Sequence, residues 1–142
     1  MHFVNSPYPA AAQMQAFFGA TEDGSFVMVN LLKFKLRAVY PHGSDSHLTG
    51  AEAYARYGAE LAPILANHGA RVIYSGAVTG LMIGECDPLW DAVALVEYPS
   101  LASFRAMVES AEYEKVAVHR TAGLEGQLNI QTKAPVTNRR VG

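Results

Sequence analysis

Two segments of the chain are apolar at almost every position, residues 26–34 and residues 90–98. A strand with one face in water alternates apolar and polar residues, and neither segment does so cleanly. Both faces of a sheet built from these strands therefore need a cover. The helices that the rest of the sequence predicts suffice for one face, so we expect a second subunit to cover the other.

Helical periodicity surrounds these strands. Residues 50–68 carry apolar side chains at three- and four-residue steps, after a capping-box sequence at 49–52. A second helical region is predicted at 100–120, with an interruption near 110–113. A short helix is predicted at 9–18, because a proline suits its first turn. The chain therefore offers two long helical regions and one short leading helix.

Further strands at 71–79 and 127–132 complete the order strand, helix, strand, strand, helix, strand. This order is the split βαβ, or ferredoxin-like, plan of an α+β fold. Two right-handed crossovers place both long helices on one face of a four-stranded antiparallel sheet. We predict a helical N-terminal extension at 1–25, a ferredoxin-like domain at 26–132 and a flexible tail at 133–142.

The sheet face that the helices leave bare is where we expect a dimer contact. Alternation along the first strand divides its residues into two sides: Phe26, Met28, Asn30, Leu32 and Phe34 on one, and Val27, Val29, Leu31 and Lys33 on the other. Which side meets the helices stays open, since both are too apolar to face water. We predict a homodimer whose two sheets pack into a barrel, driven by burial of apolar area at roughly 25 cal/mol per Å².

Composition narrows the function classes. Half of the 142 residues are hydrophobic and the net charge is −2, so a concentrated basic surface for nucleic acid is not expected. No apolar run approaches the roughly 20 residues of a membrane span, and the N-terminus lacks a secretory pattern. The single cysteine, Cys86, cannot form an intrachain disulfide. We therefore expect a soluble cytoplasmic protein that binds neither nucleic acid nor membrane.

Three stretches of sequence resemble the DUF1330 family: residues 28–34, residues 69–76, and Glu97-Tyr98-Pro99-Ser100 followed by a helix that ends near Arg120. The resemblance implies a dimeric α+β barrel, in the wider group that includes antibiotic-biosynthesis-type monooxygenases, EthD-like proteins and muconolactone isomerases. It implies no reaction, because the family lacks a generally assigned activity. The chain departs from the short family pattern by its leading helix and by a longer loop at 35–48, and either could cover the mouth of a pocket.

Polar side chains within apolar strands are the first candidates for a site, because burying them costs free energy unless they are paired. Asn30 lies inside an apolar run, and Asp91 and Glu97 flank the centre of another strand on one side. One interpretation is structural, with Asn30 bonded to neighbouring backbone and Glu97 paired with Arg120 or Lys33. The other is that these groups line a pocket between helices and sheet.

The end of the second helical region carries two further candidates. Arg120 supplies a fixed positive charge for a carboxylate or enolate ligand, or else forms an ion pair with Glu97 or Asp91. His119 is a candidate acid/base group together with Asp91, because its reference pKa is near neutrality, or else it caps helix carbonyls.

Aromatic side chains are numerous near the expected seam between helices and sheet. Tyr54 and Tyr74 are candidates to orient a partly apolar ligand, although such rings also fill cores with their hydroxyls at the edge. Trp90 borders either the pocket or the dimer interface. No phosphate-binding glycine loop, zinc-spaced cysteine pair or nucleophile elbow is present, so no cofactor and no metal site is predicted.

The leading hypothesis is a small-molecule enzyme or binder for an aromatic, polyketide-like or lactone-like ligand, with cofactor-free oxygenation or isomerisation implied by the resemblance. Arg120 would hold the ligand's charge, His119 or Asp91 would transfer a proton, and Asn30 and Tyr74 would orient it. A second hypothesis is a non-enzymatic ligand-binding or stress-associated dimer. A third is a haem-binding barrel, for which only His68 or His119 would supply an axial ligand.

Overall fold

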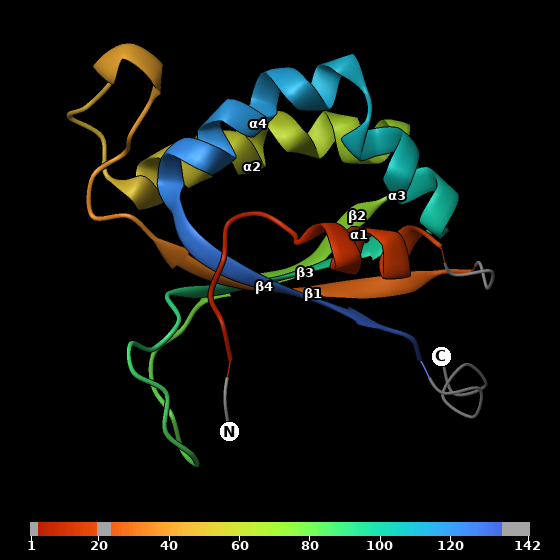
Figure 1. Ribbon diagram of the computed structural model, residues 1–142, viewed down its shortest axis with the longest axis horizontal. Coiled ribbons are helices and arrows are strands. Elements are labelled where there is room, and N and C mark those ends of the chain that lie inside the picture. The colour runs from red at the N-terminus through yellow and green to blue at the C-terminus, as the bar shows by residue number, and fades with distance from the viewer. Residues whose placement is uncertain (1–2, 20–23, 135–142) are drawn as a thin grey trace.

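The computed structural model describes residues 3–19 and 24–134, and it has a four-stranded sheet beneath a layer of helices (Figure 1). The predicted α+β, ferredoxin-like order is confirmed. The elements are α1 (Ala11–Phe18), β1 (Phe26–Phe34), a 3-10 turn (Pro41–Gly43), α2 (Gly50–Asn67), β2 (Arg71–Ala77), β3 (Ala92–Tyr98), α3 (Leu101–Val108), α4 (Ala111–Gly123) and β4 (Leu124–Thr132).

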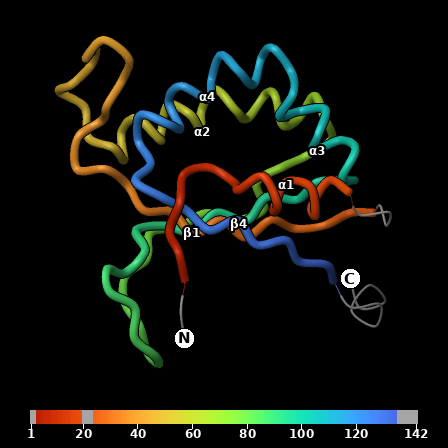
Figure 2. The backbone as a smooth tube through the Cα atoms, in the orientation of Figure 1, coloured from red at the N-terminus to blue at the C-terminus, as the bar shows by residue number. Residues whose placement is uncertain are grey.

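The sheet has the strand order β2-β3-β1-β4, and every neighbouring pair is antiparallel. The backbone path shows α2 and α4 crossing the same face of the sheet (Figure 2). β1 lies between β3 and β4, with Val29 opposite Leu95 on one side and Ile130 on the other. This register fixes which side chains share a face and therefore which can meet at a site.

The face that meets the helices is the one that carries Phe26, Met28 and Leu32, all almost fully buried. Phe26 and Met28 share a core with Leu61 and Leu65 of α2, Met107 of α3 and Val116 of α4. The opposite side of β1 carries Val27, Val29 and Leu31, each of them half-buried and uncovered by any described helix. The question that the sequence left open is thereby answered.

Two helix boundaries follow the predicted capping chemistry. Thr49 and Glu52 form the expected box, because the Thr49 hydroxyl accepts from the Glu52 N–H at 3.0 Å and the Glu52 carboxylate accepts from the Thr49 N–H at 2.9 Å. The predicted interruption near 110–113 is the junction of α3 and α4, where the Ser110 hydroxyl accepts from the Tyr113 N–H at 3.2 Å. This break turns the chain so that α4 lies along α2.

The predicted strand boundaries are less accurate. β3 begins at Ala92 rather than at residue 90, and β2 ends at Ala77 rather than at residue 79. β4 begins at Leu124, three residues before the predicted start. It follows α4 directly, because the buried Leu124 continues the core without an intervening turn.

The N-terminal segment, residues 3–19, is packed against the domain. The backbone N–H of Gln127 donates to the carbonyl of Ser6 at 2.9 Å, which joins the segment to the outer edge of β4. At the end of α1, Phe17 lies edge-on to Phe104 at 5.6 Å and to Phe26 at 6.1 Å. The predicted extension at 1–25 thus contributes side chains to the core. The predicted flexible tail falls largely on residues 135–142, which lie outside the described residues.

Within the described residues, no helix combines the length and the apolar character that crossing a bilayer requires.

Candidate functional site

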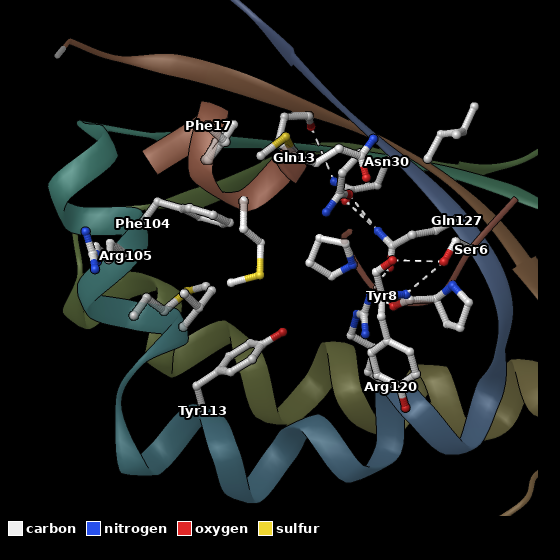
Figure 3. Close-up of a pocket in the computed structure, with 18 of the residues that line it drawn as sticks. Ser6, Tyr8, Gln13, Phe17, Asn30, Phe104, Arg105, Tyr113, Arg120 and Gln127 are labelled. Carbon is white, nitrogen blue, oxygen red and sulfur yellow. Dashed lines mark hydrogen bonds between the residues drawn. The ribbon is translucent and has the colours of Figure 1, made fainter. Parts of the chain in front are cut away.

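A cavity of about 570 Å³ lies between the sheet, helices α3 and α4, and the N-terminal segment (Figure 3). The sheet supplies its floor from β1 and β4, and the N-terminal segment closes one side. Figure 3 shows Phe17 and Phe104 at one end of the cavity and Arg120 with Gln127 at the other. The end with Phe17 and Phe104 is mainly apolar, although Arg105 lies beside Phe104 at its rim (Figure 3). A polar end and a mainly apolar end are the arrangement that a partly apolar small molecule needs.

Arg120 organises the polar end. Its guanidinium donates to the carbonyl oxygen of Pro7 at 2.7 Å and, at short range, to the side-chain oxygen of Gln127. The Gln127 amide in turn donates to the side-chain oxygens of Asn30 at 3.3 Å and of Asn129 at 2.6 Å. Gln127 is buried, so this chain of hydrogen bonds fixes the guanidinium above the sheet.

No carboxylate lies within ion-pair distance of Arg120 among the residues that the structure describes. Glu97 pairs with Arg71 at 3.1 Å, and Asp91 pairs with Lys33 at 3.2 Å. The predicted structural ion pairs of Arg120 with Glu97 or Asp91, and of Glu97 with Lys33, are therefore wrong. The half-buried guanidinium is held by neutral acceptors alone, which leaves its positive charge uncompensated.

Tyrosines line the wall between the two ends. Burial raises the pKa of Tyr54 to about 12, although the nearby charge of Arg120 acts in the opposite direction. Burial also raises the pKa of Tyr57 and of Tyr98 well above the usual value. The hydroxyls of Tyr57 and Tyr113 are hydrogen-bonded at 3.0 Å. The phenols of Tyr54, Tyr57 and Tyr98 therefore stay protonated at neutral pH and can donate hydrogen bonds.

The two predicted catalytic residues lie elsewhere. His119 faces away from the cavity, with its Nδ1 2.7 Å from the Tyr40 hydroxyl and its Nε2 3.2 Å from the Glu60 carboxylate. Asp91 accepts from the backbone N–H of Phe34 at 2.8 Å and holds the start of β3 against the end of β1. Neither side chain lines the cavity, and the predicted capping of helix carbonyls by His119 is not what the structure shows.

The remaining predicted ligand-binding residues divide between the two faces of the sheet. Asn30 and Tyr54 line the cavity together with Arg120. The Asn30 amide also donates to the backbone carbonyls of Met28 at 3.3 Å and Ala94 at 3.1 Å, so its predicted bonding to neighbouring backbone is confirmed as well. Tyr74 pairs with Leu95 across β2 and β3 on the bare face, where Glu97 also lies. Trp90 lies before β3, its ring 6.1 Å from that of Phe3.

Sequence reasoning missed two components of the site. The first is Gln127, for which the signal was its place two residues from Asn129, on the same face of a predicted strand. The second is the carbonyl of Pro7, which no side-chain pattern indicates.

Among the described residues, no histidine lines the cavity, whereas the haem hypothesis requires a histidine that faces it as axial ligand. The His68 ring nitrogen is 2.9 Å from the carbonyl oxygen of Ile64 on its own helix, and His119 is engaged as described above. Among the described residues, no group of three or more His, Cys, Asp or Glu side chains is placed to hold a metal ion.

A groove of about 520 Å³ adjoins the cavity between α2 and the β2–β3 side of the sheet. Asn30, Tyr54, Tyr57 and Tyr98 line both spaces, so the groove and the cavity are separated only by these side chains. The groove itself is otherwise almost wholly apolar.

Comparison with solved structures supports the fold and the family. The RPA0582 protein of unknown function from Rhodopseudomonas palustris is 33% identical over 93% of this chain and 98% of its own, with a TM-score of 0.83. The methylated form of the same protein gives 33% identity over 94% and 97% of the two chains, with a TM-score of 0.85. A dimeric ferredoxin-like protein of unknown function from Thermobifida fusca, 14% identical over 78% and 92% of the chains with a TM-score of 0.52, resembles this chain in fold alone.

The comparison with curated proteins gives no match. The family described as "Domain of unknown function (DUF1330)" matches residues 44–133, which include α2, all of α3 and α4, and three of the four strands. The structural relatives at 33% identity extend the likeness over almost the whole chain. The chain belongs to the DUF1330 family.

Proposed function

We propose that the chain binds a small organic anion in the cavity, with the anionic group on Arg120 and an apolar or aromatic body toward Phe17 and Phe104. The observation that carries this proposal is the guanidinium with no carboxylate partner among the described residues, at the polar end of a cavity with an aromatic opposite end. A ligand carboxylate or enolate would replace the Pro7 carbonyl as acceptor and gain a charge-assisted hydrogen bond.

Isomerisation or oxygenation of such a ligand is a second, finer proposal. Enolate formation develops negative charge on an oxygen, and Arg120 with the protonated hydroxyl of Tyr54 would stabilise that charge. The described residues that line the cavity include one carboxylate, Glu109, which lies at the rim and pairs with Arg105 at 3.4 Å. A non-enzymatic binding protein requires only the charge and the aromatic wall.

Thermal-shift measurements with matched acids and amides test the binding proposal. Salicylate, phenylacetate and 3-phenylpropionate should raise the melting temperature, whereas their neutral amides should not. A ligand at 100 times its dissociation constant stabilises the folded state by about 2.7 kcal/mol. Arg120→Gln should abolish the shift, and Arg105→Gln, which removes an exposed arginine at the rim, should retain it.

The outcomes separate the alternatives. Equal shifts in the Arg120→Gln and wild-type proteins, or equal shifts with acids and amides, would contradict the proposed site. For phenylacetate or 3-phenylpropionate, if it binds, NMR in deuterium oxide measures exchange of the hydrogens on the carbon next to the carboxylate. Exchange that depends on Arg120 supports an enzyme, and binding without exchange or consumption of oxygen supports the non-enzymatic alternative.

We also propose a homodimer that buries the bare face of the sheet. Its centre is a continuous apolar stripe across all four strands, formed in register by Tyr74, Leu95, Val29 and Ile130. A second row, Val93, Leu31 and Leu128, lies beside it. The relative from Thermobifida fusca, which shares the fold, is described as dimeric.

Sedimentation equilibrium tests the dimer. The wild-type protein should sediment as a dimer at micromolar concentration, and Val29→Asp should sediment as a monomer because it places a charge at the centre of the stripe. Leu36→Asp is the matched control, since Leu36 is 88% exposed and lies after β1 rather than on the bare face. A monomeric wild-type protein at micromolar concentration would contradict the proposed homodimer.

A further inference from the structure

The connection between β2 and β3 is an arm, residues 78–91, that projects from the sheet on the side opposite the helices (Figure 1, green). Its base is closed by a hydrogen bond of 2.9 Å from the N–H of Val78 to the carbonyl of Asp91. The N–H of Asp91 donates in turn to the carbonyl of Leu32 at 2.8 Å, which fixes the arm to the middle of the sheet.

The tip of this arm is apolar and exposed. Leu81, Met82 and Ile83 are 51%, 97% and 84% exposed, and glycines flank them on both sides. Gly84 has φ +94°, a conformation that turns the chain back at the tip and that other residues rarely adopt. Three neighbouring large apolar side chains held this far from the core are typical of a contact surface.

Local charge disfavours two classes of occupant for the tip. Glu85 and Asp87 follow it directly, and the described arm carries no Lys or Arg. Acidic neighbours repel anionic membrane surfaces and nucleic acid, both of which recruit basic residues. A protein surface that is itself apolar is the occupant that this chemistry fits.

The position of the arm points to a second copy of the chain. Four strands about 4.8 Å apart and about seven residues long give the bare face a footprint of roughly 450 Å². A stable interface buries about 800 Å² of accessible surface on each partner, so a contact that extends beyond the sheet would strengthen the dimer. The arm projects on the same side as the bare face, and its apolar tip is therefore placed to extend the interface of the proposed homodimer.

The length of the arm determines which part of the second copy it reaches. The tip lies four residues beyond Val78, and at about 3.3 Å per residue an extended chain spans roughly 13–15 Å. Two sheets that pack face to face are about 10 Å apart. The tip therefore passes the plane of the partner's sheet and arrives at the level where its helices meet the sheet.

The apolar groove between α2 and β2 lies at that level. Its floor is made of small residues, Ser75, Gly76, Ala92 and Ala94, which leave room above the sheet, and its walls include Leu61, Leu65 and Val72. Val72 is 50% exposed although it lies in a strand on the helix-facing side. This groove is thus unfilled in a single chain and matches the tip in chemistry.

We propose that the arm clasps a second copy of this chain, with Leu81, Met82 and Ile83 seated in the partner subunit's groove between α2 and β2. The inference rests on the homodimer proposed above. Because Tyr54, Tyr57 and Tyr98 separate groove from cavity, a seated tip also closes this side of each candidate site. The site is then complete only in the dimer.

Disulfide trapping between two different chains tests the clasp. One chain carries Met82→Cys and the other Val72→Cys, each with Cys86→Ser, and the two are co-expressed with distinct tags and oxidised. A covalent heterodimer is expected in at least tenfold excess over the control pair, in which Met14→Cys replaces Val72→Cys. Met14 is 45% exposed on a different apolar surface, so it matches Val72 in accessibility.

A second variant measures the contribution of the tip. The dimer dissociation constant of Met82→Asp should rise at least tenfold by sedimentation. A native dimer without the 82-to-72 disulfide would overturn the clasp and leave the homodimer standing, whereas a wild-type monomer would overturn both. Co-sedimentation of the wild-type protein with phosphatidylglycerol vesicles, lost in Met82→Asp, would assign the tip to a membrane and refute the clasp.

Discussion

Tyr113→Phe removes one hydroxyl from the wall of the cavity. It should destabilise the protein more than is usual for the loss of a hydroxyl from a half-buried side chain. Tyr57 also lines the cavity but is only 7% exposed, and the Tyr113 hydroxyl, 3.0 Å away, is the partner that the structure gives the Tyr57 hydroxyl. Tyr113 itself is only half-buried and lines the cavity. Removing its hydroxyl leaves the buried Tyr57 hydroxyl without a hydrogen-bond partner, which costs about 1–3 kcal/mol.

The reverse substitution should be cheaper. Tyr57→Phe leaves the Tyr113 hydroxyl without its partner, but that group faces the cavity, where water can bond to it. The expected cost is that of an ordinary hydrogen bond, about 0.5–1.5 kcal/mol. The double variant should be no less stable than Tyr113→Phe alone, because no buried hydroxyl is then left unpaired.

Urea denaturation of the four proteins, followed by circular dichroism at pH 7, measures both costs and their coupling. The account requires Tyr113→Phe to lose more stability than Tyr57→Phe and requires the two losses to be non-additive. Equal losses that add would refute the reasoning, since they would mean that water reaches the Tyr57 hydroxyl in the folded protein.

Three other substitutions have outcomes whose sign the structure fixes. Burial raises the pKa of Tyr54 to about 12 from about 10, so the stability that depends on its neutral form is full below pH 10 and is lost as the pH rises through about 12. The share of Tyr54 in this loss is about 3 kcal/mol by urea denaturation and should be absent in Tyr54→Phe, whereas the shares of Tyr57 and Tyr98 should remain. Gly123→Ala should destabilise by about 1–3 kcal/mol, because a Cβ there would meet the carbonyl of Gly50. Gly58→Ala should stabilise the protein by about 0.5–1 kcal/mol, because Gly58 lies inside α2 with open space around it. A higher melting temperature for Gly123→Ala than for Gly58→Ala would contradict the packing described.

The fold could be predicted from the sequence because the patterns that indicate it are local. The long periodic helix α2 begins with a capping box, and two apolar strands flank it in an order that few topologies satisfy. The start of β4 was missed because Gly123 leads from α4 into Leu124 without a turn, so no loop residues mark the boundary. Alternation showed that β1 has two apolar sides but carried no information on which one meets the helices.

The candidate site could be predicted only in part, for a related reason. Arg120, Asn30 and Tyr54 stand out as polar or aromatic groups in apolar surroundings, and all three line the cavity. Asp91 and Glu97 stand out equally, yet their partners, Lys33 and Arg71, lie on neighbouring strands and are selected by register. Periodicity places a residue on a face, whereas pairing across strands depends on tertiary structure.

His119 illustrates the same limit on a helix. Its neighbour Arg120 faces the cavity, and one residue of helical rotation, about 100°, turns His119 out of the cavity and against Tyr40 and Glu60. Tyr40 comes from the long loop after β1, whose path the sequence does not indicate.

The most direct test of the central claim is a crystal structure of the protein with 3-phenylpropionate. The account predicts the ligand carboxylate within hydrogen-bond distance of the Arg120 guanidinium, in place of the Pro7 carbonyl, and the phenyl ring beside Phe17 and Phe104. A carboxylate bound away from Arg120, with the Arg120 to Pro7 hydrogen bond intact and the cavity holding only water, would contradict it.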